Sequence, residues 1–175
     1  GLHHHDRPFQ VSVIVAEAQP DKSLVIKENH TWNFNPGVEM SEGAAEVTGV
    51  TTEQLRALPS IRDVLATGEM QEVFSRDCVY AGHNINFDIN GMKSLFSDCG
   101  ETFPEHESIC TLEMSRILLP GQSHKLCDVV SALHLTRKVK KMCGGDYHTA
   151  TFDVAATMAV YEELLPRIAS IPEKG

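Results

Sequence analysis

The stretch Cys78–Asp88, which reads CVYAGHNINFD, decides how the fold is interpreted. Its first part, Cys78–Gly82, is short and mostly apolar, which favours a buried strand. We predict a helix over Asn84–Phe96 directly after it. Polar side chains at such a junction lie beyond the end of a sheet, where α/β proteins tend to bind ligands. The simpler alternative is that Asn84 only caps the helix and Asp88 only stabilises its first turn.

The segments around this junction predict a hairpin and several helices. Two β-rich runs, Phe9–Glu17 and Ser23–Phe34, are separated by a turn at Pro20–Lys22. Ser60 is a candidate N-cap for one of the helices. The remaining predicted helices are Ser41–Glu46, Thr51–Leu58 (beginning at Thr51 or Thr52), Ile61–Arg76, Thr111–Leu119, Lys125–Leu135 and Thr149–Ile168. This order of elements indicates an α/β fold with a mixed sheet covered by helices.

Composition limits the classes of protein to consider. A chain of 175 residues suits one compact domain. No apolar run reaches the roughly 18 residues of a membrane span. The five cysteines are scattered and form no C-x-x-C pair, which argues against a thiolate zinc site and suits a reducing cytoplasm. The formal charge of −9 argues against a broad duplex-wrapping surface, although a small metal-loaded cleft remains compatible with it.

A second group of polar residues lies at His148–Asp153, HTATFD, at the start of the longest predicted helix. A spacing of five residues places His148 and Asp153 about one and a half turns apart, near one face. A carboxylate there can bind a hard cation through oxygen, and an imidazole beside it can accept a proton from water. A helix cap with a dipole-favoured Asp153 would explain the same residues without any chemistry.

Taken in order, four segments resemble the DEDD-type exonucleases, in the histidine-containing branch that includes the proofreading epsilon subunit of bacterial DNA polymerase III. The family pattern HNxxFD is matched by His83–Asp88, and HxAxxD by His148–Asp153. Between them, Thr111–Leu126 reads TLEMSRILLPGQSHKL, which is similar to T-L-x-x-x-R-x-L-L-P-G-x-S-H-K-L. Pro36–Thr51 resembles a further segment of the family, P-x-x-x-I-x-x-x-A-x-x-I-H-G-I-T.

The resemblance implies a ribonuclease H-like fold, in which a mixed sheet is flanked by helices, and a two-metal-ion reaction. Two Mg²⁺ or Mn²⁺ ions would hold the scissile phosphate, with Asp88 and Asp153 among their ligands and His148 as general base. The expected activity is release of nucleoside 5′-monophosphates from the 3′ end of DNA. Asp88, His148 and Asp153 are then expected within about 10 Å of one another at one end of the sheet.

The same resemblance implies contacts to the substrate. The positions that match nucleotide-gripping residues of the family are Leu2, Val47, Thr48, Asn84 and Phe87. Thr48 stands where the family usually has a histidine, and Phe87 can equally be a core residue. The basic stretch Arg137–Lys141 can be a solvated helix end, but its place shortly before His148 suggests phosphate contacts through Lys138, Lys140 and Lys141.

The implied partner is nucleic acid with a 3′ end, single-stranded DNA in the first place, and a DNA polymerase is a second expected partner. No membrane is expected as a partner. Two alternatives belong to other classes of protein. One is a non-catalytic module that binds nucleic acid or a polymerase, and the other is a structural domain without nucleotide contacts. An Asp-x-Glu sequence immediately upstream of Gly1 would favour the enzyme.

The family's first motif, D-x-E-T-T-G-L, is matched only by its last two residues, Gly1-Leu2. We therefore expect residues 1–175 to be a single exonuclease domain that lacks its first strand, with the metal-bridging Asp and Glu directly upstream. That strand would be central, and each buried backbone group left unpaired costs about 1–3 kcal/mol. Residues 1–175 alone are thus not expected to form the complete sheet. His3–His5 is interpreted as a natural loop rather than a tag.

Overall fold

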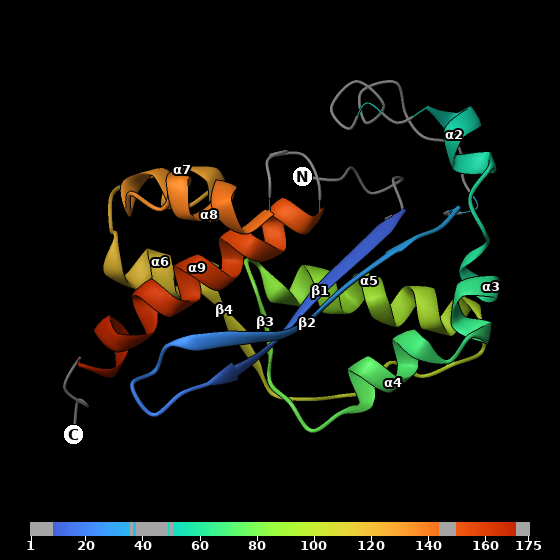
Figure 1. Ribbon diagram of the computed structural model, residues 1–175, viewed down its shortest axis with the longest axis horizontal. Helices are drawn as coiled ribbons and strands as arrows, with labels where there is room; N and C mark the ends of the chain where they lie inside the picture. Colours follow the sequence, from blue (N-terminus) through green and yellow to red (C-terminus); the bar gives the residue numbers. More distant parts are fainter. Residues whose placement is uncertain (1–8, 36, 38–48, 50, 144–149, 171–175) are drawn as a thin grey trace. The chain divides into compact units, whose positions relative to one another are not determined.

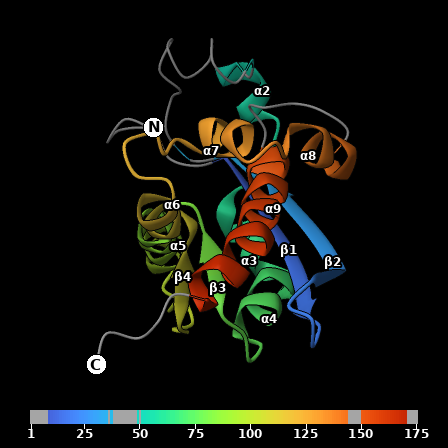
Figure 2. The ribbon, with the colours of Figure 1, turned by 90° about the vertical axis from the view of Figure 1, so that its left-hand side faces the viewer.

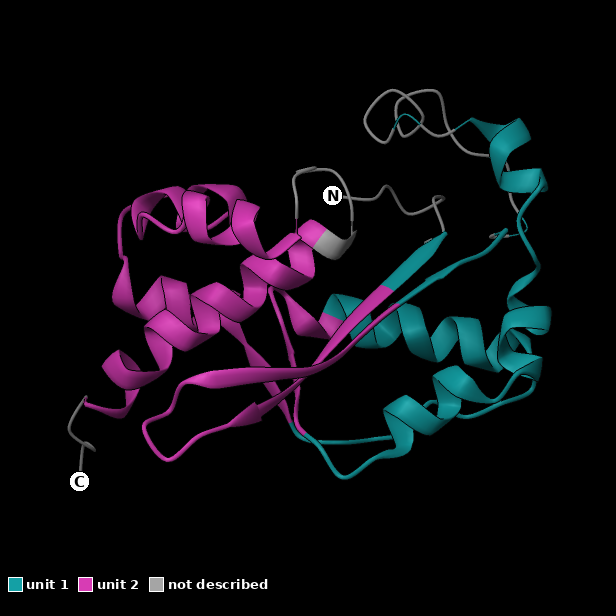
Figure 3. Ribbon diagram, viewed as in Figure 1, with its two compact units in different colours: residues 1–11, 31–78, 87–107 teal, residues 12–30, 79–86, 108–175 magenta. Residues whose placement is uncertain are grey.

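The computed structural model of the chain describes residues 9–35, 37, 49, 51–143 and 150–170. It shows an α/β fold of helices and small sheets (Figure 1). The chain divides into two compact units (Figure 3). The first contains residues 1–11, 31–78 and 87–107, and the second contains residues 12–30, 79–86 and 108–175.

The predicted hairpin is confirmed. Strands β1 (Gln10–Ala18) and β2 (Leu24–Asn33) form a hydrogen-bonded pair. The turn between them is closed by Gln19, whose amide donates to the Ser23 carbonyl over 2.8 Å and whose carbonyl accepts from the Lys22 amide over 2.8 Å. The polar residues between the two β-rich runs therefore form the turn that the sequence predicted.

In the first unit, two helices begin at hydroxyl caps: the sequence predicted the cap at Ser60, and for the other helix it predicted only a start at Thr51 or Thr52. Helix α2 (Thr52–Arg56) has Thr51 as its N-cap, with a reciprocal capping box to Gln54. Helix α3 (Ile61–Ala66) begins after Ser60, whose hydroxyl accepts from the Asp63 amide over 3.1 Å. These hydroxyls satisfy backbone N–H groups that have no partner within the helix.

The single helix predicted over Ile61–Arg76 is wrong, because the chain forms two helices there. Helix α3 ends at Ala66, and α4 (Glu69–Ser75) begins after Gly68. Gly68 has a φ of 75°, a left-handed conformation that glycine adopts without the steric cost of a side chain. On one continuous helix Met70, Val73 and Phe74 would face away from Ile61, Val64 and Leu65, so the apolar pattern changes phase at this break, and the prediction overlooked that change.

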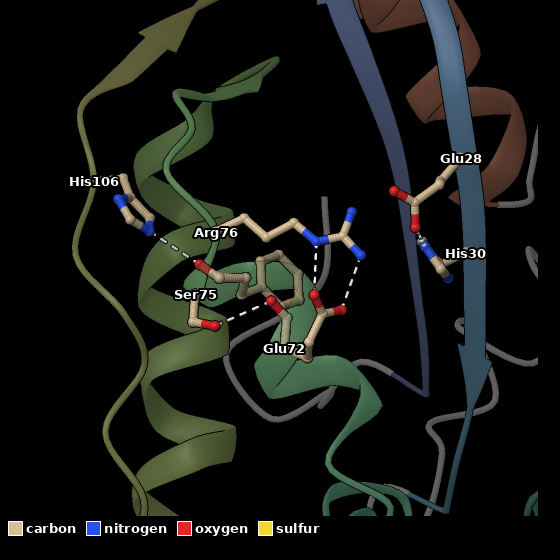
Figure 4. A network of polar contacts seen from close by, with 7 residues as sticks. Glu28, His30, Glu72, Ser75, Arg76 and His106 are labelled. Carbon is tan, nitrogen blue, oxygen red and sulfur yellow. Dashed lines mark hydrogen bonds and ion pairs between the residues drawn. The ribbon is translucent and has the colours of Figure 1, made fainter.

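The first unit has an aromatic core. The centroid of the Phe103 ring lies 5.0 Å from that of Phe74 and 5.1 Å from that of Phe96, both in edge-on arrangements. The ring centroids of Trp32 and Phe74 are 6.3 Å apart. His106 contacts the backbone beside this cluster, where its Nε2 atom bonds the Phe74 carbonyl over 3.0 Å (Figure 4). The core thus combines aromatic packing with hydrogen bonds to backbone carbonyls.

The second unit contains the strand that precedes the candidate site. Strand β3 (Tyr80–Gly82) pairs in parallel with β4 (Ser108–Cys110). The strand predicted from Cys78 is therefore two residues shorter, and Val79, which is 50% exposed, lies outside it. The sequence did not reveal β4, since three residues are too few to show a periodic pattern. In the described part of the chain, the hairpin and the β3–β4 pair are separate sheets, and a continuous mixed sheet remains a prediction.

The core of the second unit forms around α9 (Ala150–Ala169), against which α6 (Thr111–Leu118), α7 (Leu126–Ala132) and α8 (Thr136–Cys143) pack (Figures 1 and 2). The buried side chains of this core are mostly small or aliphatic: Met114, Val129, Val130, Leu135, Val139, Phe152, Ala155, Ala156, Ala159, Val160 and Leu164. Alanines on α9 allow the neighbouring helices to approach closely, as close packing of a core requires.

Helix α8 was not predicted as a separate element. The helix expected over Lys125–Leu135 ends earlier, at Ala132, and His134 has a left-handed φ of 57° before α8 begins. The predicted helix Ser41–Glu46 lies outside the described residues. None of the helices that the structure describes has the length and apolar character required to cross a membrane.

Candidate functional site

The predicted site residues fall into two groups. His148, Leu2, Val47 and Thr48 lie outside the described residues, so their predicted roles remain predictions. The others lie at the junction between β3 and α5, on α8, or near the start of α9. The described part of the site can therefore be built from three places in the fold.

The first place is the turn between β3 and α5 (Ile85–Asp98). Strand β3 ends at Gly82, and the helix begins only three residues later. Asn84 fills this turn with a left-handed φ of 67° and is exposed. Asparagine tolerates that conformation better than most residues because its short amide can bond locally. Because the turn is this short, helix α5 follows strand β3 almost directly.

A hydrogen-bonded cluster around His83 ties this turn to two distant segments. The His83 Nδ1 atom lies 2.9 Å from the Thr111 hydroxyl oxygen, and its Nε2 atom lies 2.6 Å from the His124 carbonyl oxygen. The Thr111 hydroxyl also lies 3.3 Å from the Gly82 carbonyl. Thr111 is fully buried. The last strand residue, the turn and the start of α6 are thereby joined through one imidazole.

The chemistry of the partners fixes the protons in this cluster. A carbonyl oxygen can only accept, so the His83 Nε2 atom carries a proton. In the neutral ring Nδ1 must then accept from the Thr111 hydroxyl. That hydroxyl has one proton, which is therefore shared between Nδ1 at 2.9 Å and the Gly82 carbonyl oxygen at 3.3 Å. Burial lowers the pKa of His83, the bond to the His124 carbonyl opposes that shift, and the nearby His124 and Arg116 side chains lower the pKa further. The neutral form, with its proton on Nε2, is therefore favoured.

His124 is held in turn by its own side chain, which bonds the Leu119 carbonyl through Nε2 over 2.7 Å. This bond closes the segment between α6 and α7, and it steadies the carbonyl that accepts from His83. Sequence reasoning placed Thr111 and His124 in a family-like segment but gave them no role. No local pattern connects them to His83, because they are 28 and 41 residues further along the chain.

Asp88 lies in the first turn of α5, as predicted, and its side chain is exposed. Phe87 is 53% exposed, so the interpretation of Phe87 as a core residue is wrong. A large exposed ring beside an exposed carboxylate is available for contact with a flat, charged ligand. The role of Phe87 in binding a nucleotide remains a prediction.

Asp153 lies in the first turn of α9 and is exposed, whereas its neighbour Phe152 is 2% exposed. The Asp153 carbonyl accepts from the Thr157 hydroxyl over 2.7 Å. Buried Phe152 and Ala155 fix this part of the helix on the core of the second unit. The carboxylate therefore points away from a well-packed surface.

Asp88 belongs to the first compact unit and Asp153 to the second, so their predicted proximity remains a prediction. Among the described residues, no group of three or more His, Cys, Asp or Glu side chains lies close enough to hold a metal ion. Carboxylate oxygens are the metal ligands that Mg²⁺ and Mn²⁺ prefer. A complete metal site would need ligands beyond those two.

Helix α8 presents the predicted basic residues, with Val139 fully buried and Lys138, Lys140 and Lys141 exposed. The Lys138 ammonium bonds Glu162 Oε1 over 2.7 Å, and Glu162 Oε2 accepts from the Leu24 amide over 2.8 Å. The Lys138 bond is the largest cause of a lowered pKa of Glu162; burial opposes it. Lys138 thus has a structural role in linking α8 to α9.

Residues 1–161 match the profile of the exonuclease family RNase_T, and the chain therefore belongs to this exonuclease family. The 3′-5′ exonuclease DinG of Bacillus subtilis (strain 168) is 24% identical over 170 residues, which cover 95% of this chain and 16% of the relative. DinG of Staphylococcus aureus (strain USA300) is 28% identical over 114 residues, 63% of this chain and 11% of the relative. The chain thus spans only a small part of these curated relatives.

Solved structures show the same fold. Exonuclease X in complex with 5′ overhanging duplex DNA has a TM-score of 0.63 at 20% identity, covering 92% of this chain and 85% of that one. Escherichia coli Exonuclease I with a dT13 oligonucleotide has a TM-score of 0.72 at 19% identity, covering 97% of this chain and 40% of that one. At these identities the likeness establishes the fold.

Proposed function

We propose that the protein is a metal-dependent 3′→5′ exonuclease that releases nucleoside 5′-monophosphates from DNA. The observation that carries the proposal is the pair of exposed aspartates, each in the first turn of a helix, inside a chain of the exonuclease family. The relatives named as 3′-5′ exonucleases support the direction of cleavage. The similar structures determined with DNA oligonucleotides support DNA as substrate.

Asp88 and Asp153 would help to hold two Mg²⁺ or Mn²⁺ ions, because carboxylate oxygens suit these hard cations. The remaining ligands are proposed to be the Asp-x-Glu pair of the family's first motif. When bound, the ions supply positive charge that stabilises the displaced phosphate oxygens and eases deprotonation of water. A ribonuclease H-like mixed sheet, completed by the strand of that motif, would bring these carboxylates together.

His148 is proposed to accept the proton of the attacking water. The water oxygen forms a new bond to phosphorus, and the bond between phosphorus and the 3′ oxygen of the preceding nucleotide breaks. The leaving 3′ oxygen takes up a proton from solvent, so the products are a nucleoside 5′-monophosphate and a strand shortened by one nucleotide with a free 3′ hydroxyl. Leu2, Val47, Thr48, Asn84 and Phe87 are proposed to hold the terminal nucleotide.

The similarity to the epsilon subunit suggests a polymerase as partner, and the second candidate function is a non-catalytic module that binds nucleic acid or a polymerase. The matches to DinG favour the enzyme. The deciding test compares the full-length protein with its Asp88→Asn and Asp153→Asn variants on a 3′-labelled single-stranded oligonucleotide with Mn²⁺. Stepwise shortening by the wild type alone supports the proposal. Equal shortening by all three proteins, or by none, contradicts it.

A further inference from the structure

The cluster of His83, Thr111 and His124 lies outside the proposed chemistry, yet it sits directly beside Asn84 and the start of α5. Its contacts are short, with 2.9 Å to Thr111 and 2.6 Å to the His124 carbonyl. Thr111 is fully buried. We infer that these three residues form a clamp that positions the Asn84 turn and, through α5, the carboxylate of Asp88.

The backbone explains why this turn needs such a clamp. Asn84 has a φ of 67°, which asparagine tolerates better than most residues but which still costs free energy that surrounding contacts must offset. Its own side chain is exposed, and so are the side chains of Asn86 and Phe87, which follow buried Ile85. Of the first four residues of α5 only Ile85 is buried, so apolar support at this helix start is small, and the hydrogen bonds of His83 add to it.

Each atom of the clamp has a separate task. The Nε2–H group of His83 donates to the His124 carbonyl and so holds the turn against the segment before α7. The Thr111 hydroxyl donates to Nδ1 and holds the same ring against the first residue of α6. The imidazole ring is thus bonded on both sides, which leaves it one orientation. His83 is accordingly a positioning residue, since it acts on the site only through Asn84 and α5.

The inference rests on the proposed function for its catalytic consequence, and a set of variants in the full-length protein tests it. His83→Ala removes both bonds, whereas His83→Gln keeps an amide N–H that can reach the His124 carbonyl. Loss of a residue that orients a metal ligand typically lowers metal affinity or activity by about 10- to 100-fold. We expect that loss in kcat for His83→Ala, with a smaller change in KM, and partial recovery in His83→Gln.

Thr111 provides an independent pair of variants that keeps the imidazole. Thr111→Val preserves the shape of the buried side chain but removes the hydroxyl, while Thr111→Ser keeps the hydroxyl. We expect Thr111→Val to lower kcat and to weaken Mn²⁺ binding measured by calorimetry, and Thr111→Ser to retain both. His106→Ala is the matched control, because His106 also bonds a backbone carbonyl through Nε2 but lies away from Asn84 in sequence and belongs to the other compact unit.

Nitrogen-15 NMR of the His83 ring and of the Asn84 amide separates this inference from the proposed function. If the wild type does not cleave DNA, the proposed function fails, and the clamp is then judged by NMR alone. The clamp is supported if the His83 ring is protonated on Nε2 and if the chemical shift of the Asn84 amide changes in Thr111→Val but not in Thr111→Ser. A ring protonated only on Nδ1, or wild-type kcat in both a folded His83→Ala and Thr111→Val, overturns it. If His83→Ala does not fold, the two Thr111 variants decide.

Discussion

The two helix starts that carry aspartates are held in different ways. The start of α5, with Asp88, follows a left-handed Asn84 and is tied by hydrogen bonds through His83. The start of α9, with Asp153, is fixed by buried Phe152 and Ala155 in an apolar core. Hydrogen bonds specify direction strictly but add only modest net stability, whereas apolar burial adds more stability with less directional control.

This difference predicts that substitutions at the two helix starts will separate into different phenotypes. At α9, the carboxylate and its apolar support are neighbouring residues, so catalysis and stability can be removed one at a time. At α5, the support is polar and distant in sequence, so its loss should disturb geometry more than stability.

The largest effect is expected for the residues proposed to act on the substrate. His148→Ala should lower kcat by about 10²–10⁴-fold, because it removes the general base, while metal binding remains. Asp153→Asn should reduce both turnover and Mn²⁺ affinity. Rates on a 3′-labelled oligonucleotide and calorimetric Mn²⁺ titrations of the full-length protein measure these effects. A fully active Asp153→Asn variant would exclude a role for Asp153 in holding metal.

The second effect concerns the apolar support of α9. Phe152 is 2% exposed, and removing a buried phenylalanine side chain costs about 3–5 kcal/mol of unfolding free energy. Exposed Asp153 is the matched neighbour, and Asp153→Asn should change that free energy by no more than about 1 kcal/mol, the size of the interaction of a carboxylate with a helix start. Urea unfolding of Phe152→Ala and Asp153→Asn measures both values. Similar losses in the two variants would contradict the separation of support from chemistry at α9.

The sequence predicted the parts of the fold that local patterns encode. The hairpin, the cap at Ser60 and the helix start near Thr51 were correct because turn residues and capping hydroxyls act within a few positions. The break at Gly68 was missed although the apolar pattern changes phase there, and strand β4 was missed because three residues are too few to create a periodic pattern.

The candidate site shows the same limit. Exposed Asp88 and Asp153 lie in helical first turns, as their spacing and the family resemblance indicated. The bonds of His83 to Thr111 and His124 could not be inferred, because hydrogen-bond partners so far apart in the chain are set by tertiary packing. Likewise, the sequence suggested that Lys138 contacts phosphate, and only the structure revealed its bond to Glu162.

The third prediction uses the lowered pKa of His83 to test the polar side of the comparison. Above its ordinary pKa of about 6.5, the ring is neutral in both the folded and the unfolded chain. As pH falls below that value, the unfolded chain binds a proton before the folded one does, so folding stability decreases. The decrease ends once pH is below the folded-state pKa. In His83→Gln, the part of the decrease in unfolding free energy that comes from His83 should be absent, as measured by urea unfolding between about pH 5 and 8. If the unfolding free energy of His83→Gln depends on pH as that of the wild type does, the pKa of His83 does not change on folding.

The smallest effect is expected on α8, where one lysine supports the fold and two are proposed to face the substrate. Lys138 is bonded to Glu162, so Lys138→Gln should cost up to about 1 kcal/mol of stability, as partly exposed ion pairs do, and change DNA binding little. Lys140→Gln with Lys141→Gln should instead flatten the salt dependence of single-strand binding, by about 0.7 in the logarithmic slope for each lost phosphate contact. Fluorescence anisotropy with a labelled oligonucleotide over a range of salt concentrations measures the slope.

The control for this last comparison is Lys22→Gln with Lys27→Gln on the hairpin, which changes the net charge of the protein by the same amount. If binding depended only on overall charge, this pair would flatten the slope as much as the α8 pair does. A contact specific to α8 requires the two slopes to differ, because counterions are released only where lysines neutralise phosphates directly. Equal slopes in the two double variants would show that Lys140 and Lys141 belong to a solvated surface, and α8 would then serve only to cover α9 through buried Val139.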